Sequence, residues 1–258
     1  MYAVPSGPDK FARISYPAAG LVDMQEGSVE ICVRNDFDST VPLANPFYAP
    51  MTYVRVRDES GHRDVLHVLA RSVSEGRDLG IIVGKASNFV SATRPEALGW
   101  RGKGEWHYLA ITWKTDLNRC VLKLYQDGRF IEQVAEMQSG PPLITEYMNI
   151  YVGNADFGGS FATVDELRVS AVERSAEEIK TASFRWDRLS IGFKWDRFTL
   201  LLDHFGRIEP DTSGKASWTL VEGGVRGHIE GAFRAVPGRS GRALQLHVVE
   251  EEFSRGGR

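Results

Sequence analysis

The stretch EWHYLAITW, residues 105–113, decides the fold class of this chain. Read as an extended strand, it places aromatic or aliphatic side chains on both of its faces. A strand that is apolar on both faces belongs in the middle of a packed structure. The stretch EGSVEICVR, residues 26–34, differs, because Val29, Ile31 and Val33 alternate with Glu, Cys and Arg. This alternation predicts a strand with one buried and one half-exposed face.

Other short runs rich in β-branched and aromatic residues recur between turn residues. They are Met51–Arg57, Asp64–Ala70, Leu79–Gly84, Cys120–Gln126, Phe130–Ala135, Met148–Gly153 and Val164–Ser170. Asp127 and Gly128 separate two of these runs, and such a pair readily adopts the backbone of a tight hairpin turn. Strands 120–126 and 129–135 are therefore expected to be antiparallel neighbours. The whole pattern predicts an all-β, antiparallel β-sandwich rather than βαβ units.

One short helix is expected after this series of strands. Ser175 is a good N-cap residue, and Glu178 stands at the third helical position, which is the arrangement of a capping box. Two similar pieces follow, FRWDR at 184–188 and FKWDR at 193–197. An echo this short does not indicate a repeat architecture. We interpret it as a linker that crosses the sandwich surface and is anchored by its aromatic residues.

The composition excludes several classes of protein. With 42% hydrophobic and 25% charged residues, the chain is neither disordered nor fibrous, and its 258 residues are enough for one large β-sandwich. Its 31 basic residues are balanced by 34 acidic ones, so no basic surface for nucleic acid is expected. No apolar run approaches the roughly 20 residues that cross a bilayer, so no membrane span is expected. Met1–Lys10 lacks the pattern of a signal peptide, although an extracellular or virion-associated location is favoured.

Three pieces, taken in order, resemble a known family: residues 26–34, residues 105–113 and VDELRV at 164–169. Together with the 125–130 hairpin and the helix after Ser175, they resemble a laminin G-like module of the concanavalin A-like lectin family. The resemblance covers residues 14–181. It implies a jelly-roll topology and a module that binds a glycan or a protein surface without catalysis. Related modules often bind a calcium ion, which the resemblance makes a candidate cofactor.

The family pattern starts again after the helix. Thr199–Phe205 resembles the first strand of such a module, and Gly238–Leu244 resembles its next landmark. We therefore expect a jelly-roll core at 1–183, a linker at 184–198, and the first strands of a module at 199–258. These strands complete the same sandwich, as in a circular permutation, or complete a neighbouring copy. A third alternative is that the chain is a fragment of a longer multi-module protein.

No catalytic residue is predicted. Retaining glycosidases on this scaffold carry a Glu-x-Asp-x-Glu run or a close variant, because the two carboxylates must lie about 5 Å apart. Glu209 and Asp211 begin such a run, but Ser213 follows, and adjacent Asp165 and Glu166 are expected to point to opposite faces of a strand. The six histidines form no metal-binding cluster, and His107 is expected to be structural. Cys32 and Cys120 are predicted to be buried free thiols.

A calcium ion would require oxygen ligands on the sandwich loops. Asn154, Asp156 and Asp165 are the best candidates by their proximity in sequence, and Asp36 and Asp38 are the second choice. The alternative is that Asp165 accepts hydrogen bonds from backbone amides, since Asp and Asn are common turn residues.

Loop aromatic residues are the candidates for ligand contact, because sugars stack on exposed aromatic rings. They are Phe47, Tyr48, Phe89, Trp100 and Phe157. The sequence thus predicts a non-catalytic recognition module at an exterior surface. The alternatives are a structural subunit of a virion, tail or surface filament, assembled as a homo-oligomer by strand exchange, and, third, a glycoside hydrolase on the same scaffold.

Overall fold

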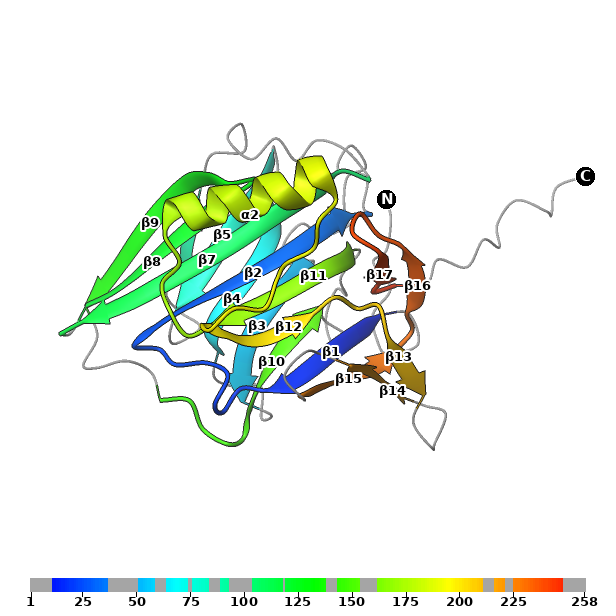
Figure 1. Cartoon of the computed structure of the whole chain (residues 1–258). Coiled ribbons are helices and arrows are strands. Elements are labelled where there is room, and N and C mark those ends of the chain that lie inside the picture. Colours follow the sequence, from blue (N-terminus) through cyan, green and yellow to red (C-terminus); the bar gives the residue numbers. More distant parts are fainter. Residues whose placement is uncertain are drawn as a thin grey trace, which may run out of the picture.

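The chain folds into two antiparallel β-sheets that pack face to face, with helix α2 on the outside of one of them (Figure 1). The computed structural model describes residues 11–36, 51–58, 64–73, 76–83, 89–92, 104–117, 119–137, 143–153, 162–210, 216–220 and 225–247. This architecture confirms the predicted all-β sandwich.

The nine-stranded sheet is named here the open sheet. In spatial order it contains β13 (Ile208–Pro210), β14 (Ala216–Leu220), β15 (Arg226–Gly231), β1 (Ala12–Pro17), β10 (Met148–Gly153), β3 (Met51–Asp58), β4 (Asp64–Val73), β5 (Gly76–Val83) and β6 (Phe89–Ala92). The eight-stranded sheet, named the covered sheet, contains β16 (Arg234–Pro237), β17 (Arg242–Gln245), β11 (Ala162–Ser170), β2 (Glu26–Asn35), β7 (Trp106–Asp116), β8 (Arg119–Gln126) and β9 (Arg129–Met137), with β12 (Thr199–Asp203) also paired to β11.

The main core lies between the sheets and follows from the period-2 pattern of the strands. Ile14, Ile150 and Val56 of the open sheet face Val29, Ile31 and other aliphatic residues of the covered sheet, all of them 1% exposed or less. The fully buried Trp113 has its ring against Gly27 of the neighbouring strand. A Cβ at position 27 would overlap that ring, so the close packing of β2 and β7 requires glycine there.

The structure explains why β7 is apolar on both faces. Leu109, Ile111 and Trp113 point into the main core. Tyr108 and Ala110 point the other way, into a second apolar cluster that also contains Ile179 and Trp186 of α2 and Phe193 beyond it. The helix therefore supplies the cover that the sequence pattern demanded.

Helix α2 (Ala176–Leu189) begins with the predicted capping box: the Glu178 backbone N–H donates to Ser175 Oγ at 3.3 Å, and the Ser175 N–H donates to the Glu178 carboxylate at 2.8 Å. The helix ends at Ser190, which adopts the left-handed conformation with φ of 52°. Residues 184–189 are thus helical, and the expected linker is reduced to residues 190–198, named here the strap.

The hairpin prediction is also confirmed. Strand β8 pairs with β9 around Asp127 and Gly128, whose φ angles of 51° and 75° are those of a tight two-residue turn. Cys32 and Cys120 are buried free thiols, as predicted.

The C-terminal strands pair with both sheets of the chain, and in Figure 1 β13, β14 and β15 lie beside β1. β12 and β17 share one edge of β11, with β12 along residues 167–170 and β17 along residues 163–164. β15 pairs with β1, and Phe11 forms a bridge with His247. The Tyr16 hydroxyl of β1 donates to Asp203 of β12 at 2.7 Å. The first and last described residues of the chain therefore lie next to each other.

Candidate functional site

A single row of directly opposed residues crosses all nine strands of the open sheet. Cross-strand register gives the row Glu209, Trp218, His228, Ser15, Tyr151, Arg55, His67, Ile82 and Phe89. Alternate residues of the same strands, such as Ile14, Ile150 and Val56, lie in the main core. Because side chains alternate along a strand, the middle of the row faces away from the core. From β15 to β4, the outer face of the open sheet is therefore formed by His228, Ser15, Tyr151, Arg55 and His67.

The part of this face built by β15, β1 and β10 is partly exposed, and its side chains hold each other in place. Arg13 forms an ion pair with Glu230 across the β1–β15 pair, and their side chains are 28% and 38% exposed. The Arg13 guanidinium lies 5.1 Å from the centre of the Tyr151 ring. Asn149 Nδ2 donates to the Tyr151 hydroxyl at 3.3 Å. These contacts fix donors, acceptors and a ring on one surface. We name Arg13, Ser15, Asn149, Tyr151, His228 and Glu230 the outer polar face.

The centre of the row is more deeply buried. Arg55 is 9% exposed and His67 is 6% exposed. Burial, together with the nearby charges of Arg55 and Arg57, lowers the pKa of His67 to about 3. His67 Nε2 lies 3.0 Å from the Thr52 hydroxyl. His67 is therefore a neutral hydrogen-bonding group at ordinary pH.

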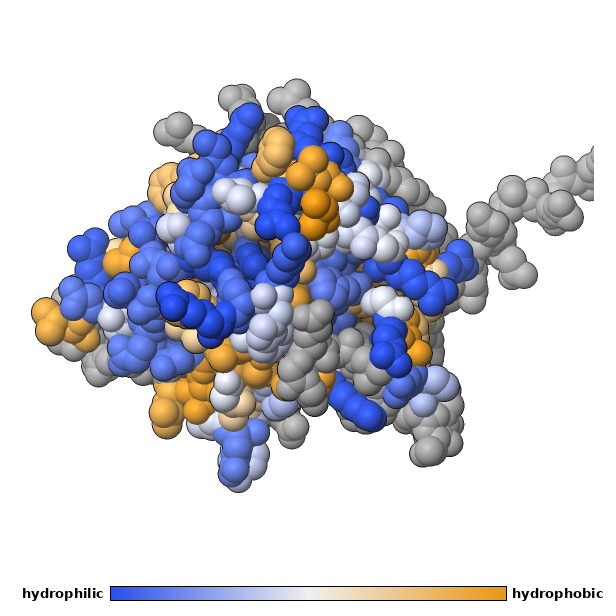
Figure 2. Space-filling view, in the orientation of Figure 1, coloured by the Kyte–Doolittle hydropathy of each residue, from blue (hydrophilic) through white to orange (hydrophobic). Residues whose placement is uncertain are grey.

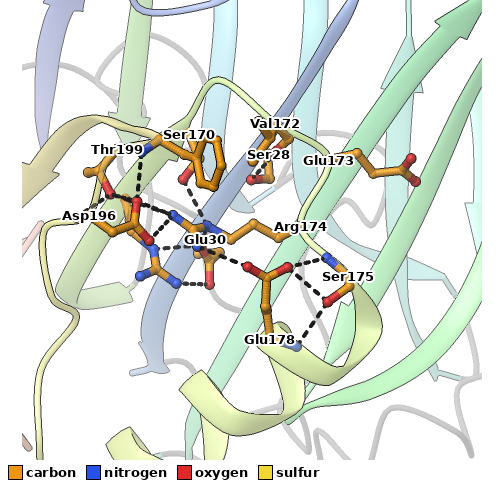
Figure 3. A network of polar contacts seen from close by, with 12 residues as sticks. Ser28, Glu30, Ser170, Val172, Glu173, Arg174, Ser175, Glu178, Asp196 and Thr199 are labelled. Atoms are coloured by element: carbon orange, nitrogen blue, oxygen red, sulfur yellow. Dashed lines mark hydrogen bonds and ion pairs between the residues drawn. The ribbon is translucent and has the colours of Figure 1, made fainter.

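The outer face of the covered sheet is closed by α2 and the strap, which are fastened by a buried ion network (Figure 3). Glu30 is fully buried and accepts from Arg168 Nε at 2.6 Å and Arg168 Nη2 at 2.7 Å. Tyr108 also donates to Glu30. Arg174 reaches Glu30 at 3.3 Å and donates to both oxygens of Asp196 of the strap, at 2.8 and 3.0 Å. Because each buried charge has a partner, this network is structural.

Asp165 and Glu166 occupy a β-bulge of β11, and the expectation that they point to opposite faces is wrong. Val164 pairs with Val33 and Leu167 pairs with Ile31, so two residues of β11 lie opposite one residue of β2. A bulge of this kind breaks the alternation of side chains. Both carboxylates consequently reach the Ser240 hydroxyl, Asp165 at 3.4 Å and Glu166 at 2.6 Å.

Each of these carboxylates fastens a different part of the chain. Asp165 accepts from the backbone amides of Arg239 and Ser240 at 2.8 and 3.1 Å. Glu166 accepts from the Phe193 amide of the strap at 3.0 Å and lies 2.7 Å from His204 Nδ1. Burial raises the pKa of Asp165, and the two amides oppose that rise. With its oxygens engaged in this way, Asp165 acts as an anchor for backbone amides, which is the alternative that the sequence left open.

The other predicted site residues have varied outcomes. Tyr48, Trp100, Phe157, Asn154, Asp156 and Asp38 lie outside the described residues, as does Phe47. Phe89 holds the last register position of the row on the open sheet. Asp36 accepts from Arg34 Nε at 2.8 Å and from the Thr163 hydroxyl at 2.6 Å. In the part of the chain that the structure describes, no group of three His, Cys, Asp or Glu residues is placed to hold a metal ion. The calcium site stays a prediction.

Sequence reasoning missed the outer polar face. Its members are spread from residue 13 to residue 230, and only the pairing of β15 with β1 and of β1 with β10 brings them together. The available signal was the alternation of polar residues in two strands, Arg13 and Ser15 in β1 and Asn149 and Tyr151 in β10. His107, by contrast, is structural as expected, because its Nδ1 lies 2.9 Å from Asp127 of the hairpin turn.

Comparisons with known proteins place this architecture among solved structures. A SAP-like pentraxin from Limulus polyphemus matches with a TM-score of 0.50 at 12% identity, over 78% of this chain and 90% of the pentraxin. A "putative carbohydrate binding protein" from Bacteroides ovatus matches with a TM-score of 0.53 at 12% identity, over 93% of this chain and 59% of that protein. The chain shares its overall β-sandwich fold with these two proteins. At this identity the likeness concerns the fold alone, and this chain spans less than two thirds of the Bacteroides protein.

No family model and no curated protein matches the chain. The laminin G-like resemblance therefore remains a prediction within the broader fold. Helix α2, the helix that the described residues include, is too short and too polar to cross a membrane.

Proposed function

We propose that this chain is a non-catalytic carbohydrate-binding module and that its ligand lies on the outer polar face. The observation that carries the proposal is the direct opposition of His228, Ser15 and Tyr151 on three adjacent strands, flanked by the Arg13–Glu230 pair. Cross-strand contacts hold the side chains of this surface in place.

The chemistry of this face suits a polyol. Sugar hydroxyls donate and accept hydrogen bonds together, so they need both kinds of partner. Arg13 and Asn149 supply donors, Glu230 supplies an acceptor, and the Ser15 hydroxyl supplies both. The Tyr151 ring lies between them, although it is only 8% exposed and is packed under the Arg13 guanidinium. Hydrogen bonding rather than stacking on Tyr151 therefore dominates the recognition that we propose.

The outer faces of the two sheets differ in how far other elements of the chain cover them. α2 and the strap cover the outside of the covered sheet, where the ion network neutralises its own charges. Among the described elements, no helix or strap covers the outside of the open sheet. The likeness to a protein described as carbohydrate binding supports the same class of ligand at the level of the fold.

A glycan array probed with the full chain, with and without calcium, tests this function. We expect binding to at least one oligosaccharide, confirmed by titration calorimetry. Asn149→Ala should weaken that binding about tenfold, because one well-placed hydrogen bond is lost. Gln133→Ala removes an amide from exposed residue 133 of β9, on the other sheet, and serves as the matched control. Silence of the array in both conditions, or equal effects of the two variants, would contradict the proposal.

Assembly by strand exchange is a second candidate function, favoured by the way the C-terminal strands pair. β12, β15 and β17 occupy one edge of β11 and one edge of β1, and each edge accepts them through backbone hydrogen bonds. The same edges fit the same strands of a second copy. Size-exclusion chromatography with light scattering over a hundredfold range of concentration tests this. Ordered oligomers would support it, and a monomer throughout would exclude it.

A further inference from the structure

A hollow of about 150 Å³ lies between α2 and the strap, on the side of the sandwich opposite to the outer polar face. Arg168 of β11 and Phe193 of the strap line it, Arg185 of the helix borders it, and Ile191 and Lys194 of the strap complete its wall. A wider hollow of about 440 Å³, near the start of α2, shares Arg168 and Arg185 with it. Neither hollow is part of the function proposed above.

The charges around the smaller hollow do not cancel. Arg168 is neutralised by Glu30 through two hydrogen bonds of 2.6 and 2.7 Å. Asp196, the carboxylate of its wall, is engaged by Arg174 at 2.8 and 3.0 Å. The side chains of Arg185 and Lys194 form no ion pair or hydrogen bond with any residue that the structure describes. Two cations therefore remain without a counter-charge at the mouth of the hollow.

The wall between these cations is apolar. Phe193 is 6% exposed, and its ring lies 4.9 Å from the Arg168 guanidinium. Ile191 is 37% exposed and Ala182 is partly buried. Figure 2 shows this face of the molecule, which is hydrophilic over much of α2 and has apolar side chains near the C-terminal end of the helix. An anion that also carries an apolar group fits such a wall better than a small hydrated ion does.

The wider hollow has the opposite character. Glu177 and Glu178 border it beside Arg174, and Glu178 is already engaged by the Ser175 capping box. Two additional carboxylates make it unfavourable for an anion. The smaller hollow is therefore the place where negative charge is stabilised.

We propose that the smaller hollow binds a small organic carboxylate, with its carboxylate between Arg185 and Lys194 and its apolar part against Ile191 and Phe193. Such a ligand bridges the helix and the strap. A free carboxylic acid and the C-terminus of a peptide share this chemistry, and both belong among the probes.

Amide chemical-shift mapping of the full chain tests this site, with phenylacetate, the tripeptide Gly-Gly-Phe, acetate and inorganic phosphate as probes. Phenylacetate should cause saturable shifts at the amides of Ala182, Gly192 and Phe193. Arg185→Gln and Lys194→Gln should each weaken this binding about tenfold, because a charged hydrogen bond is lost. Lys180→Gln, which removes an exposed cation from the same helix away from the hollow, is the matched control and should leave the affinity unchanged.

The outcomes separate the alternatives. Tighter binding of Gly-Gly-Phe than of phenylacetate supports the site and identifies a peptide terminus as its ligand. Equal shifts with acetate, phosphate and phenylacetate would overturn the proposal, because the apolar wall would then contribute nothing. Shifts that persist unchanged in the Arg185→Gln, Lys194→Gln double variant would overturn it as well. Lys194 is exposed and Arg185 is partly exposed, so urea unfolding should confirm that both variants fold normally.

Discussion

Asp165 and Glu166 are neighbours in the chain, and yet both carboxylates reach the hydroxyl of Ser240, at 3.4 and 2.6 Å. The bulge of β11 makes this possible. It lies between the part of β11 that pairs with β17 and the part that pairs with β12. The two carboxylates therefore hold the place where the strap, the 238–241 turn and the C-terminal strands meet.

Removing the Asp165 carboxylate should destabilise the protein. Asp165→Ala leaves two partly buried backbone amides, those of Arg239 and Ser240, without an acceptor. We expect the free energy of unfolding to fall by about 2–4 kcal/mol in urea titrations. Asp165→Asn keeps an oxygen at the same place and should cost clearly less. Equal losses in the two variants would show that the amides do not depend on this oxygen.

The difference in unfolding free energy between the wild type and Asp165→Asn should change with pH in one direction. Burial raises the pKa of Asp165, so the folded state holds this proton more tightly than the unfolded state does. Stability from this group is then present below the ordinary aspartate pKa and is lost as pH rises towards the folded pKa. Unfolding free energies measured from pH 3 to pH 7 should show the wild type losing stability relative to Asp165→Asn as pH rises. A gain over that range would contradict the raised pKa.

The bulge of β11 is a feature that could not be predicted from the sequence, unlike the strands and turns around it. The strands, the Asp127–Gly128 hairpin and the Ser175 capping box were predictable, because each depends on residues close in sequence. The apolar character of both β7 faces predicted a strand in the middle of the packed structure, and α2 provides the packing on its outer face. The extra residue in β11 has no local signature, and the alternation rule therefore failed at Asp165 and Glu166.

The candidate site was less predictable than the fold. Sequence reasoning looked for aromatic residues on loops, whereas the outer polar face comes from strands at opposite ends of the chain. Arg13 and Glu230 pair only because β15 adds to β1. Cross-strand register depends on long-range pairing, and no single stretch of sequence contains it.

The buried Glu30–Arg168 pair should be much more costly to break than to replace. Glu30→Leu leaves the buried Arg168 guanidinium without its counter-charge. Arg168→Met removes two hydrogen bonds from the fully buried Glu30 carboxylate and leaves it with Arg174 at 3.3 Å and the Tyr108 hydroxyl. Each single change should cost about 3–5 kcal/mol of unfolding free energy. The double variant Glu30→Leu, Arg168→Met should lose far less than the sum of two single changes.

A surface ion pair provides the control for the comparison of these single and double variants. Lys123 Nζ lies 2.7 Å from Glu173 Oε1, and both side chains are partly exposed. Lys123→Met should therefore cost less than about 1 kcal/mol. Additive losses at the Glu30–Arg168 pair, similar in size to this control, would show that the network contributes little.

Gly231 should be essential for the contact between β15 and β1. It has a φ of +90°, and a Cβ there would overlap the backbone of Phe11. Gly20 has a φ of +79° with open space around it, so Gly20→Ala measures the cost of the backbone conformation alone, about 1–2 kcal/mol. Gly231→Ala should cost more and should reduce the hydrogen-exchange protection of β15 amides. If the two variants behave alike, the close approach of Phe11 is not important for this junction.

His67 should remain neutral across the ordinary pH range, and this is measurable directly. Its pKa is lowered to about 3, first by burial and then by the charges of Arg55 and Arg57. The unfolded chain binds this proton near pH 6.5, so stability from His67 is fully present above that pH and is lost as pH falls towards 3. NMR should show a constant imidazole shift for His67 from pH 8 to pH 4. His67→Gln should flatten the fall in unfolding free energy over pH 6.5 to 4, whereas a His67 midpoint near 6.5 would mean that the centre of the row is hydrated and open to ligand.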